Sequence, residues 1–126
     1  MIRAVTTGGA PGAIGPYSQG IDTGSLVFVA GQVGLDPATG ELVEGIEAQT
    51  ERAMRNIRAV LDAAGLTMAD VVKTTVLLAD IDDFATVNAV YARFVGDPPP
   101  ARATYAVAAL PRGARIEIEA IAARKA

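Results

Sequence analysis

One long amphipathic segment, residues 46–64, limits the possible folds of this chain more than any other part. Its apolar residues recur at spacings of three, four and seven; they are Ile46, Ala53, Ile57, Val60, Leu61 and Ala64. This spacing predicts a helix with one buried face. Gly65 stands where a left-handed residue is expected to end that helix.

Shorter segments with strand-like composition lie on both sides of this helix. Three strands are expected before it, at residues 2–7, 17–23 and 26–30, with a hairpin turn at 22–25. The glycine- and proline-containing residues 8–16 and the residues 31–45 are expected to be loops.

The second half of the chain repeats this alternation. The β-branched residues 71–78 predict a strand, and Asp82 is a plausible N-cap for a second helix that ends before Pro98. Residues 102–108 and 115–122 are expected to form a β-hairpin. The order β-β-β-α-β-α-β-β predicts an α+β sandwich, residues 1–126 as one domain, with both helices on one face of a mixed sheet. The other face would need a cover, which a second subunit could supply.

The absence of two residue types restricts the chemistry. The chain contains no His and no Cys, which excludes His- or thiolate-bound zinc and any catalytic pair that uses His. The net charge of −3, with no run of Lys or Arg, argues against a nucleic-acid partner. No segment resembles a secretory signal or a membrane helix, so we expect a cytoplasmic protein with no membrane partner. Neither a metal nor a cofactor is expected.

A few residues remain as candidates for a site. Arg102 follows the proline run and could clamp a carboxylate, although a lone Arg at a strand end is more often merely exposed. Glu117 and Glu119 alternate along one strand and so share a face, where one could relay protons if partly buried. Tyr17 could orient a ligand or simply pack. Asn88 could form a hydrogen bond across an interface or be an ordinary polar residue on a helix flank.

Five segments taken together resemble the RidA/YjgF family of small trimeric proteins. They occur in the order typical of that family, and they are GPYSQ at 15–19, VAGQ at 29–32, FATVNAVY at 84–91, PPARAT at 99–104 and IEIEAIA at 116–122. The resemblance implies a chorismate-mutase-like protomer, of which three close a central barrel with ligand clefts between subunits.

The resemblance also implies roles for single residues. Arg102 would hold the substrate carboxylate, Glu117 would position the attacking water, and Tyr17 would line the cleft. Gly31 and Asn88 would also border the cleft.

The chain departs from the family pattern at two positions. Ala30 stands where many members carry Ser or Thr, and Thr104 where many carry Cys. A hydroxyl at Thr104 can keep a hydrogen bond to a ligand but cannot act as a thiol.

The resemblance implies the hydrolysis of reactive 2-imino acids, such as 2-iminobutanoate and 2-iminopropanoate, to 2-keto acids and ammonia. Three alternatives stay open at this point. The chain could be a trimer that binds 2-keto acids without turnover, or a deaminase specific to one pathway. Relatives have also been described as nucleases, which the acidic balance of this chain disfavours.

Overall fold

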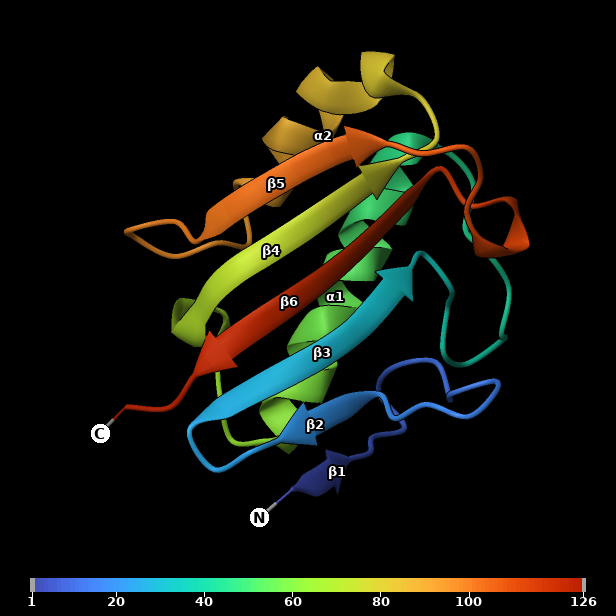
Figure 1. Cartoon of the computed structure of the whole chain (residues 1–126). Helices are drawn as coiled ribbons and strands as arrows, with labels where there is room; N and C mark the ends of the chain where they lie inside the picture. Colours follow the sequence, from blue (N-terminus) through green and yellow to red (C-terminus); the bar gives the residue numbers. More distant parts are fainter. Residues whose placement is uncertain (1, 126) are drawn as a thin grey trace.

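The computed structural model describes residues 2–125, which form one layer of strands and one layer of helices (Figure 1). The sheet has six strands in the order β1-β2-β3-β6-β4-β5. The strands are β1 (Arg3–Val5), β2 (Gly20–Asp22), β3 (Leu26–Val33), β4 (Val71–Leu78), β5 (Ala101–Ala106) and β6 (Ile116–Ala123); the helices are α1 (Ile46–Ala63) and α2 (Phe84–Tyr91). Neighbouring strands are antiparallel except for β4 and β5, which are parallel. The expected α+β architecture with a mixed sheet is confirmed.

The expected β-hairpin of the last two strands is wrong. β6 lies between β3 and β4 and is antiparallel to both, whereas β5 pairs with β4 alone at the edge of the sheet. Every second side chain of β6 is buried, so this strand gains most from a central position. β5 has no buried residue, and it follows β4 through α2, a crossover of the kind that joins parallel strands.

Helix α1 covers the centre of the sheet and supplies much of the core. Met54, Ile57 and Leu61 are fully buried against it, and each such side chain contributes about 1.5–3 kcal/mol by leaving water. The predicted end of the helix is confirmed. Gly65 has φ +77°, its N–H donates to Asp62 O, and the N–H of Leu66 donates to Leu61 O, as in a Schellman motif.

The bounds of three predicted elements need correction. The second helix starts at Phe84 after a short 3₁₀ turn, Ile81–Asp83, and the residue that caps this turn is Asp80, whose carboxylate accepts from the N–H of Asp82. The second strand is shorter than expected and begins at Gly20. β3 is longer than expected and continues to Val33, because Gly31 belongs to a β-bulge rather than to a loop.

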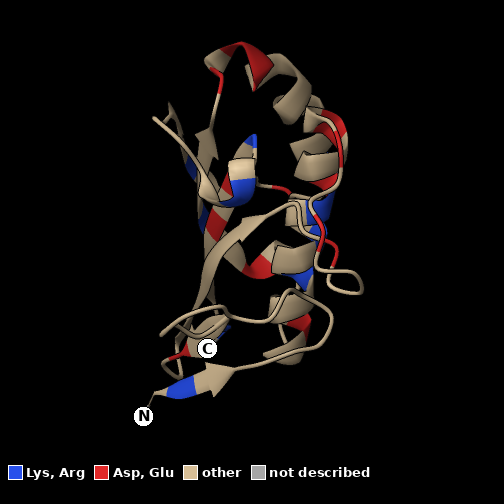
Figure 2. Cartoon of the chain, turned by 90° about the vertical axis from the view of Figure 1, so that its right-hand side faces the viewer, with Lys and Arg blue, Asp and Glu red and all other residues tan. Residues whose placement is uncertain are grey.

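The face of the sheet opposite the helices is uncovered within residues 2–125 (Figures 1 and 2). It carries half-exposed apolar side chains such as Phe28, at 41% exposure. Figure 2, which views the two layers from the side, shows Lys and Arg interspersed with Asp and Glu. Neither described helix has the length and apolar character needed to span a bilayer.

Candidate active site

Arg102 lies on the helix-covered face of β5 and stacks on two aromatic rings. Its guanidinium carbon is 5.0 Å from the centre of the Tyr91 ring and 5.4 Å from that of Phe84. Such distances are typical of cation–π contacts, which fix the cation while leaving its N–H groups available. Within residues 2–125 the Arg102 side chain forms no hydrogen bond and no salt bridge. The guanidinium is therefore held in place with its donors unused.

Two buried oxygens near Arg102 also lack a partner. Thr104 follows Arg102 by two positions on β5, so both side chains point to the same face. Asn88 lies on α2 between Phe84 and Tyr91, at helical spacings that put the three on one side of the helix. Thr104 Oγ1 and Asn88 Oδ1 are buried and have no hydrogen-bond partner among the described residues. Because buried polar atoms are nearly always paired, these two oxygens are available to pair with a ligand, a water molecule or another subunit.

These five residues are called the Arg102 cluster below; they are Arg102, Thr104, Asn88, Phe84 and Tyr91. The first three are the residues that the sequence predicts as site residues. From the sequence, Phe84 and Tyr91 are noted only as part of the FATVNAVY segment, and their contact with Arg102 is not predicted. Their spacing of seven residues shows that they share a helix face, but nothing in the sequence shows that β5 lies beneath that face.

Glu117 lies on the opposite, uncovered face of the sheet and packs against Gly31. The bulge in β3 brings the Gly31 backbone so close that a Cβ there would lie 2.7 Å from Glu117 Oε2 and 2.9 Å from Glu117 Cδ. The absence of a side chain at Gly31 therefore leaves the space that the Glu117 carboxylate occupies. β-bulges are over-represented next to active sites because they re-aim neighbouring groups.

The surroundings of Glu117 favour its protonated form. Partial burial raises the pKa of the Glu117 carboxyl above its usual range, and the negative charge of Glu119 on the same face raises this pKa further. A carboxylate with a raised pKa is a stronger base than an exposed one, so Glu117 is better suited to accept a proton near neutral pH.

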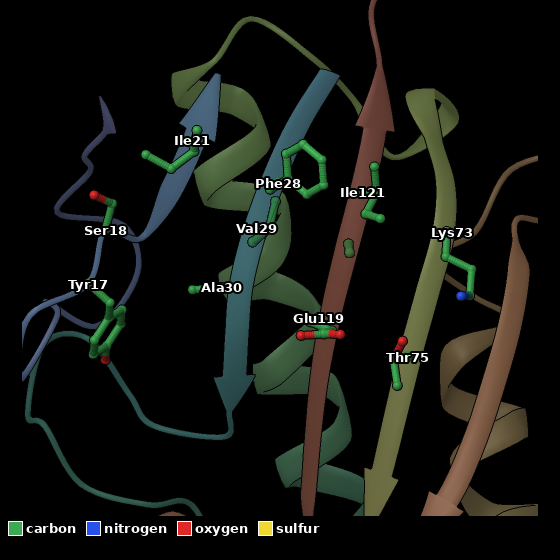
Figure 3. Close-up of a pocket in the computed structure, with 11 residues that line it drawn as sticks. Tyr17, Ser18, Ile21, Phe28, Val29, Ala30, Lys73, Thr75, Glu119 and Ile121 are labelled. Atoms are coloured by element: carbon green, nitrogen blue, oxygen red, sulfur yellow. The ribbon is translucent and has the colours of Figure 1, made fainter. Parts of the chain in front are cut away.

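Tyr17 borders a hollow of about 430 Å³ on the uncovered face. Figure 3 shows Tyr17 at one side of this hollow, with Ala30 and Phe28 on β3, Glu119 on β6, and Thr75 on β4. The residues that form what we call the Glu117 cluster are Glu117, Glu119, Gly31 and Tyr17. No group of three or more potential metal ligands occurs among residues 2–125.

The buried side chain of Gln19 shapes the loop that precedes Tyr17. Its Oε1 accepts from the N–H of Thr7 at 2.7 Å, and its Nε2 donates to the carbonyls of Thr7, Ala10 and Pro11. These bonds tie the first part of the glycine-rich loop to Gln19, the residue that precedes β2. The sequence does not predict this role of Gln19, for which the one signal is its place within the GPYSQ segment.

The Arg102 cluster and the Glu117 cluster lie on opposite faces of the same sheet. Thr74, the partner of Arg102 in the β4–β5 register, is buried on the helix side, whereas Glu117 and Glu119 alternate with the buried residues of β6 and face away from the helices. A single chain thus does not bring Arg102 and Glu117 together. The two clusters can meet only if one copy of the chain places its β5 edge against the uncovered face of another.

Comparison with known proteins gives matches along the whole chain. The family model described as Endoribonuclease L-PSP matches residues 7–124. The human 2-iminobutanoate/2-iminopropanoate deaminase is 51% identical over 121 residues, which cover 95% of this chain and 88% of that protein. The Salmonella typhimurium protein of the same name is 48% identical over 128 residues, which cover 99% of this chain and 100% of that protein. The structure of E. coli TdcF with bound serine has a TM-score of 0.94 at 43% identity, and covers 98% of this chain and 99% of that one.

Proposed function

Because this chain belongs to the RidA/YjgF family, we propose that it is an imine deaminase, a hydrolase that converts 2-imino acids such as 2-iminobutanoate and 2-iminopropanoate to 2-keto acids and ammonia. The relatives at about 50% identity carry the name of this activity. The reaction needs a group that holds the substrate carboxylate, a group that orients water, and little else.

The observation that carries the proposal is the condition of Arg102. A half-buried guanidinium that pairs with no carboxylate among residues 2–125 is suited to bind an anionic ligand through two parallel hydrogen bonds. The unpartnered oxygens of Thr104 and Asn88 lie beside it. An iminium or imine N–H can donate to the Asn88 carbonyl, and the Thr104 hydroxyl can donate to a carboxylate oxygen.

The proposed chemistry is addition of water followed by loss of ammonia. Arg102 anchors the carboxylate and thereby fixes the imine carbon. The substrate reacts as its iminium form. Glu117 accepts a proton from the water while the water oxygen bonds to the iminium carbon, and the product is a neutral carbinolamine. The protonated Glu117 returns the proton to the amino group, the C–N bond breaks and ammonia leaves. As the carbonyl forms, the hydroxyl proton passes back to Glu117, which then releases it to water. Tyr17 and the Gly31 backbone border the cleft.

This assignment requires copies of the chain to associate. We propose a homotrimer in which the Arg102 cluster of one subunit faces the Glu117 cluster of the next, with a cleft at each interface. The uncovered apolar sheet face and the position of β5 at the sheet edge support such contacts. A cytoplasmic location, where imines from amino-acid metabolism would form, is part of the same proposal.

The residues present are sufficient for the rate that such a reaction demands. Imines of this kind already hydrolyse in water without a catalyst, and an acceleration of two to four decades corresponds to about 3–5 kcal/mol of transition-state stabilisation. Orientation of the substrate together with one general base can supply that much.

A trapping assay tests the proposal. An amino-acid oxidase generates the 2-imino acid in the presence of semicarbazide, and the rate of semicarbazone formation is followed with and without the protein. We expect the wild type to suppress this rate and Arg102→Ala to lose the effect while keeping the oligomeric state. Arg55→Ala, which removes a surface Arg paired with Glu51 on α1, is the matched control. Full activity of Arg102→Ala would refute the carboxylate clamp.

Two other functions give different results with the same variants. A trimer that only binds 2-keto acids would bind them in wild type and Glu117→Gln without suppressing the semicarbazone in either. A deaminase specific to one pathway would suppress it for a single imino acid among many. If the protein were a nuclease, as the description of the family model suggests, the purified protein would degrade RNA.

A further inference from the structure

We propose that Tyr91, held by Thr74, is a positioning residue that sets how tightly Arg102 binds the substrate carboxylate. The inference rests on the proposed function, since it concerns the affinity of that site. Neither Thr74 nor Tyr91 is placed to touch the substrate in this proposal. Both are buried beneath the guanidinium.

The contact that carries this inference is a short hydrogen bond in the core. Thr74 Oγ1 and Tyr91 Oη lie 2.6 Å apart, and both residues are buried. This bond fixes the far end of the Tyr91 ring, so the ring cannot tilt about its Cα–Cβ bond. Tyr91 belongs to α2 and Thr74 to β4. The bond therefore joins the helix that covers β5 to the strand that pairs with β5.

The ring held in this way is the surface on which Arg102 lies. Its guanidinium carbon is 5.0 Å from the Tyr91 ring centre. Thr74 is also the direct neighbour of Arg102 in the parallel β4–β5 register. The Thr74 hydroxyl, the Tyr91 ring and the Arg102 guanidinium thus contact one another in this order, from the core to the proposed cleft. Within this arrangement, a tilt of the ring displaces the fork of N–H groups that must meet both carboxylate oxygens.

Arg102 has no other anchor of comparable strength. Phe84, the second ring, is 40% exposed and forms no hydrogen bond that would hold it. Arg102 itself forms no polar contact within residues 2–125. The Thr74–Tyr91 bond is therefore the main restraint on the position of the guanidinium before a ligand arrives. Preorganisation of this kind raises affinity by reducing the entropy lost on binding.

A double-mutant cycle separates positioning from ordinary core stability. Tyr91→Phe and Thr74→Val each remove one hydroxyl and leave the other buried without a partner, so each should lower the melting temperature. The double variant Thr74→Val/Tyr91→Phe leaves no unpaired hydroxyl and should regain most of that loss. If the bond positions Arg102, KM stays raised in the double variant by roughly fivefold, the range expected for a weakened cation–π contact, with kcat within about twofold of wild type.

Two further variants complete the design. Thr74→Ser keeps the hydroxyl and should keep the wild-type KM. Thr86→Val removes an exposed hydroxyl on α2, outside both clusters, and should change neither KM nor stability. A purely structural role predicts instead that KM recovers together with the melting temperature in the double variant, and this result would overturn the inference.

A direct titration with 2-oxobutanoate keeps this test distinct from that of the deaminase activity. We expect the double variant to bind this keto acid about fivefold more weakly than wild type. If the wild type binds 2-oxobutanoate but hydrolyses no imine, the proposed function fails. The ratio of the Kd of the double variant to that of the wild type still decides whether Tyr91 positions Arg102. If wild type does not bind 2-oxobutanoate at all, both the clamp and its positioning residue are refuted.

Discussion

The Gly31→Ala substitution gives the sharpest test of the Glu117 cluster, which lies on the uncovered face of the sheet. The added methyl would lie 2.7 Å from Glu117 Oε2, 2.9 Å from Cδ and 3.2 Å from Cγ, while ordinary contact begins near 3.4 Å. The Glu117 side chain must therefore move by about 0.7 Å at its oxygen, the difference between 2.7 Å and that ordinary contact distance. The φ angle of Gly31 is not in the left-handed region, so an alanine adds no backbone strain there.

This displacement should affect catalysis more than stability. A general base moved by nearly 1 Å no longer aligns water with the imine carbon, and such misplacement costs roughly 10- to 100-fold in rate. We expect kcat/KM in the trapping assay to fall by that factor. The melting temperature should change little, because a half-exposed Glu side chain can move towards solvent.

Two controls decide whether Gly31 acts through Glu117. Gly8→Ala adds a methyl where nothing lies within 4 Å, and should leave activity unchanged. Gly31→Ala/Glu117→Gln should be no less active than Glu117→Gln alone, because both changes disable the same group. Full activity of Gly31→Ala, or additive losses in the double variant, would refute the reasoning.

Three further predictions concern charge and unpaired groups. Glu119→Gln removes a negative charge beside Glu117 and so lowers the pKa of that carboxyl; the acid limb of the pH profile of kcat/KM should move to lower pH. Thr104→Val removes a buried hydroxyl that has no partner within residues 2–125, so KM should rise severalfold while the melting temperature holds or increases. Asp22 receives hydrogen bonds from Arg124 at 2.6 Å and from Arg3 at 2.8 Å. Because these bonds hold the pKa of Asp22 well below its usual range, Asp22→Asn should lower the melting temperature near neutral pH, and its difference from wild type should shrink as pH falls below about 4.

The sequence predicts those parts of the fold that depend on local periodicity. The α1 pattern, its glycine end and the β-branched strand at 71–78 are confirmed almost residue by residue. The order of strands in the sheet is a different kind of information, because it depends on which strand gains most by central burial. The last two strands are neighbours in sequence, so hairpin pairing was the simplest prediction, and β6 instead inserts between β3 and β4.

The site residues also divide into those that a local pattern predicts and those that depend on how distant segments pack. The shared face of Glu117 and Glu119 follows from alternation along a strand and is confirmed. The contact of Gly31 with Glu117 depends on a bulge, and a glycine in sequence indicates a strand end as readily as a close approach. The Thr74–Tyr91 bond joins residues 17 positions apart on elements whose relative placement no local pattern determines. The roles of Arg102, Glu117, Tyr17, Asn88 and Thr104 in catalysis stay predictions.

The placement of the two clusters on opposite faces of one sheet has a genetic consequence. If every cleft takes its Arg102 from one subunit and its Glu117 from the next, Arg102→Ala and Glu117→Gln chains are each inactive alone, yet they complement one another. Any trimer that contains both kinds of chain has one cleft built from the two intact halves. Random mixing of equal amounts should therefore restore about a quarter of the wild-type clefts. Two defective alleles of such a gene would together give deaminase activity that neither gives by itself.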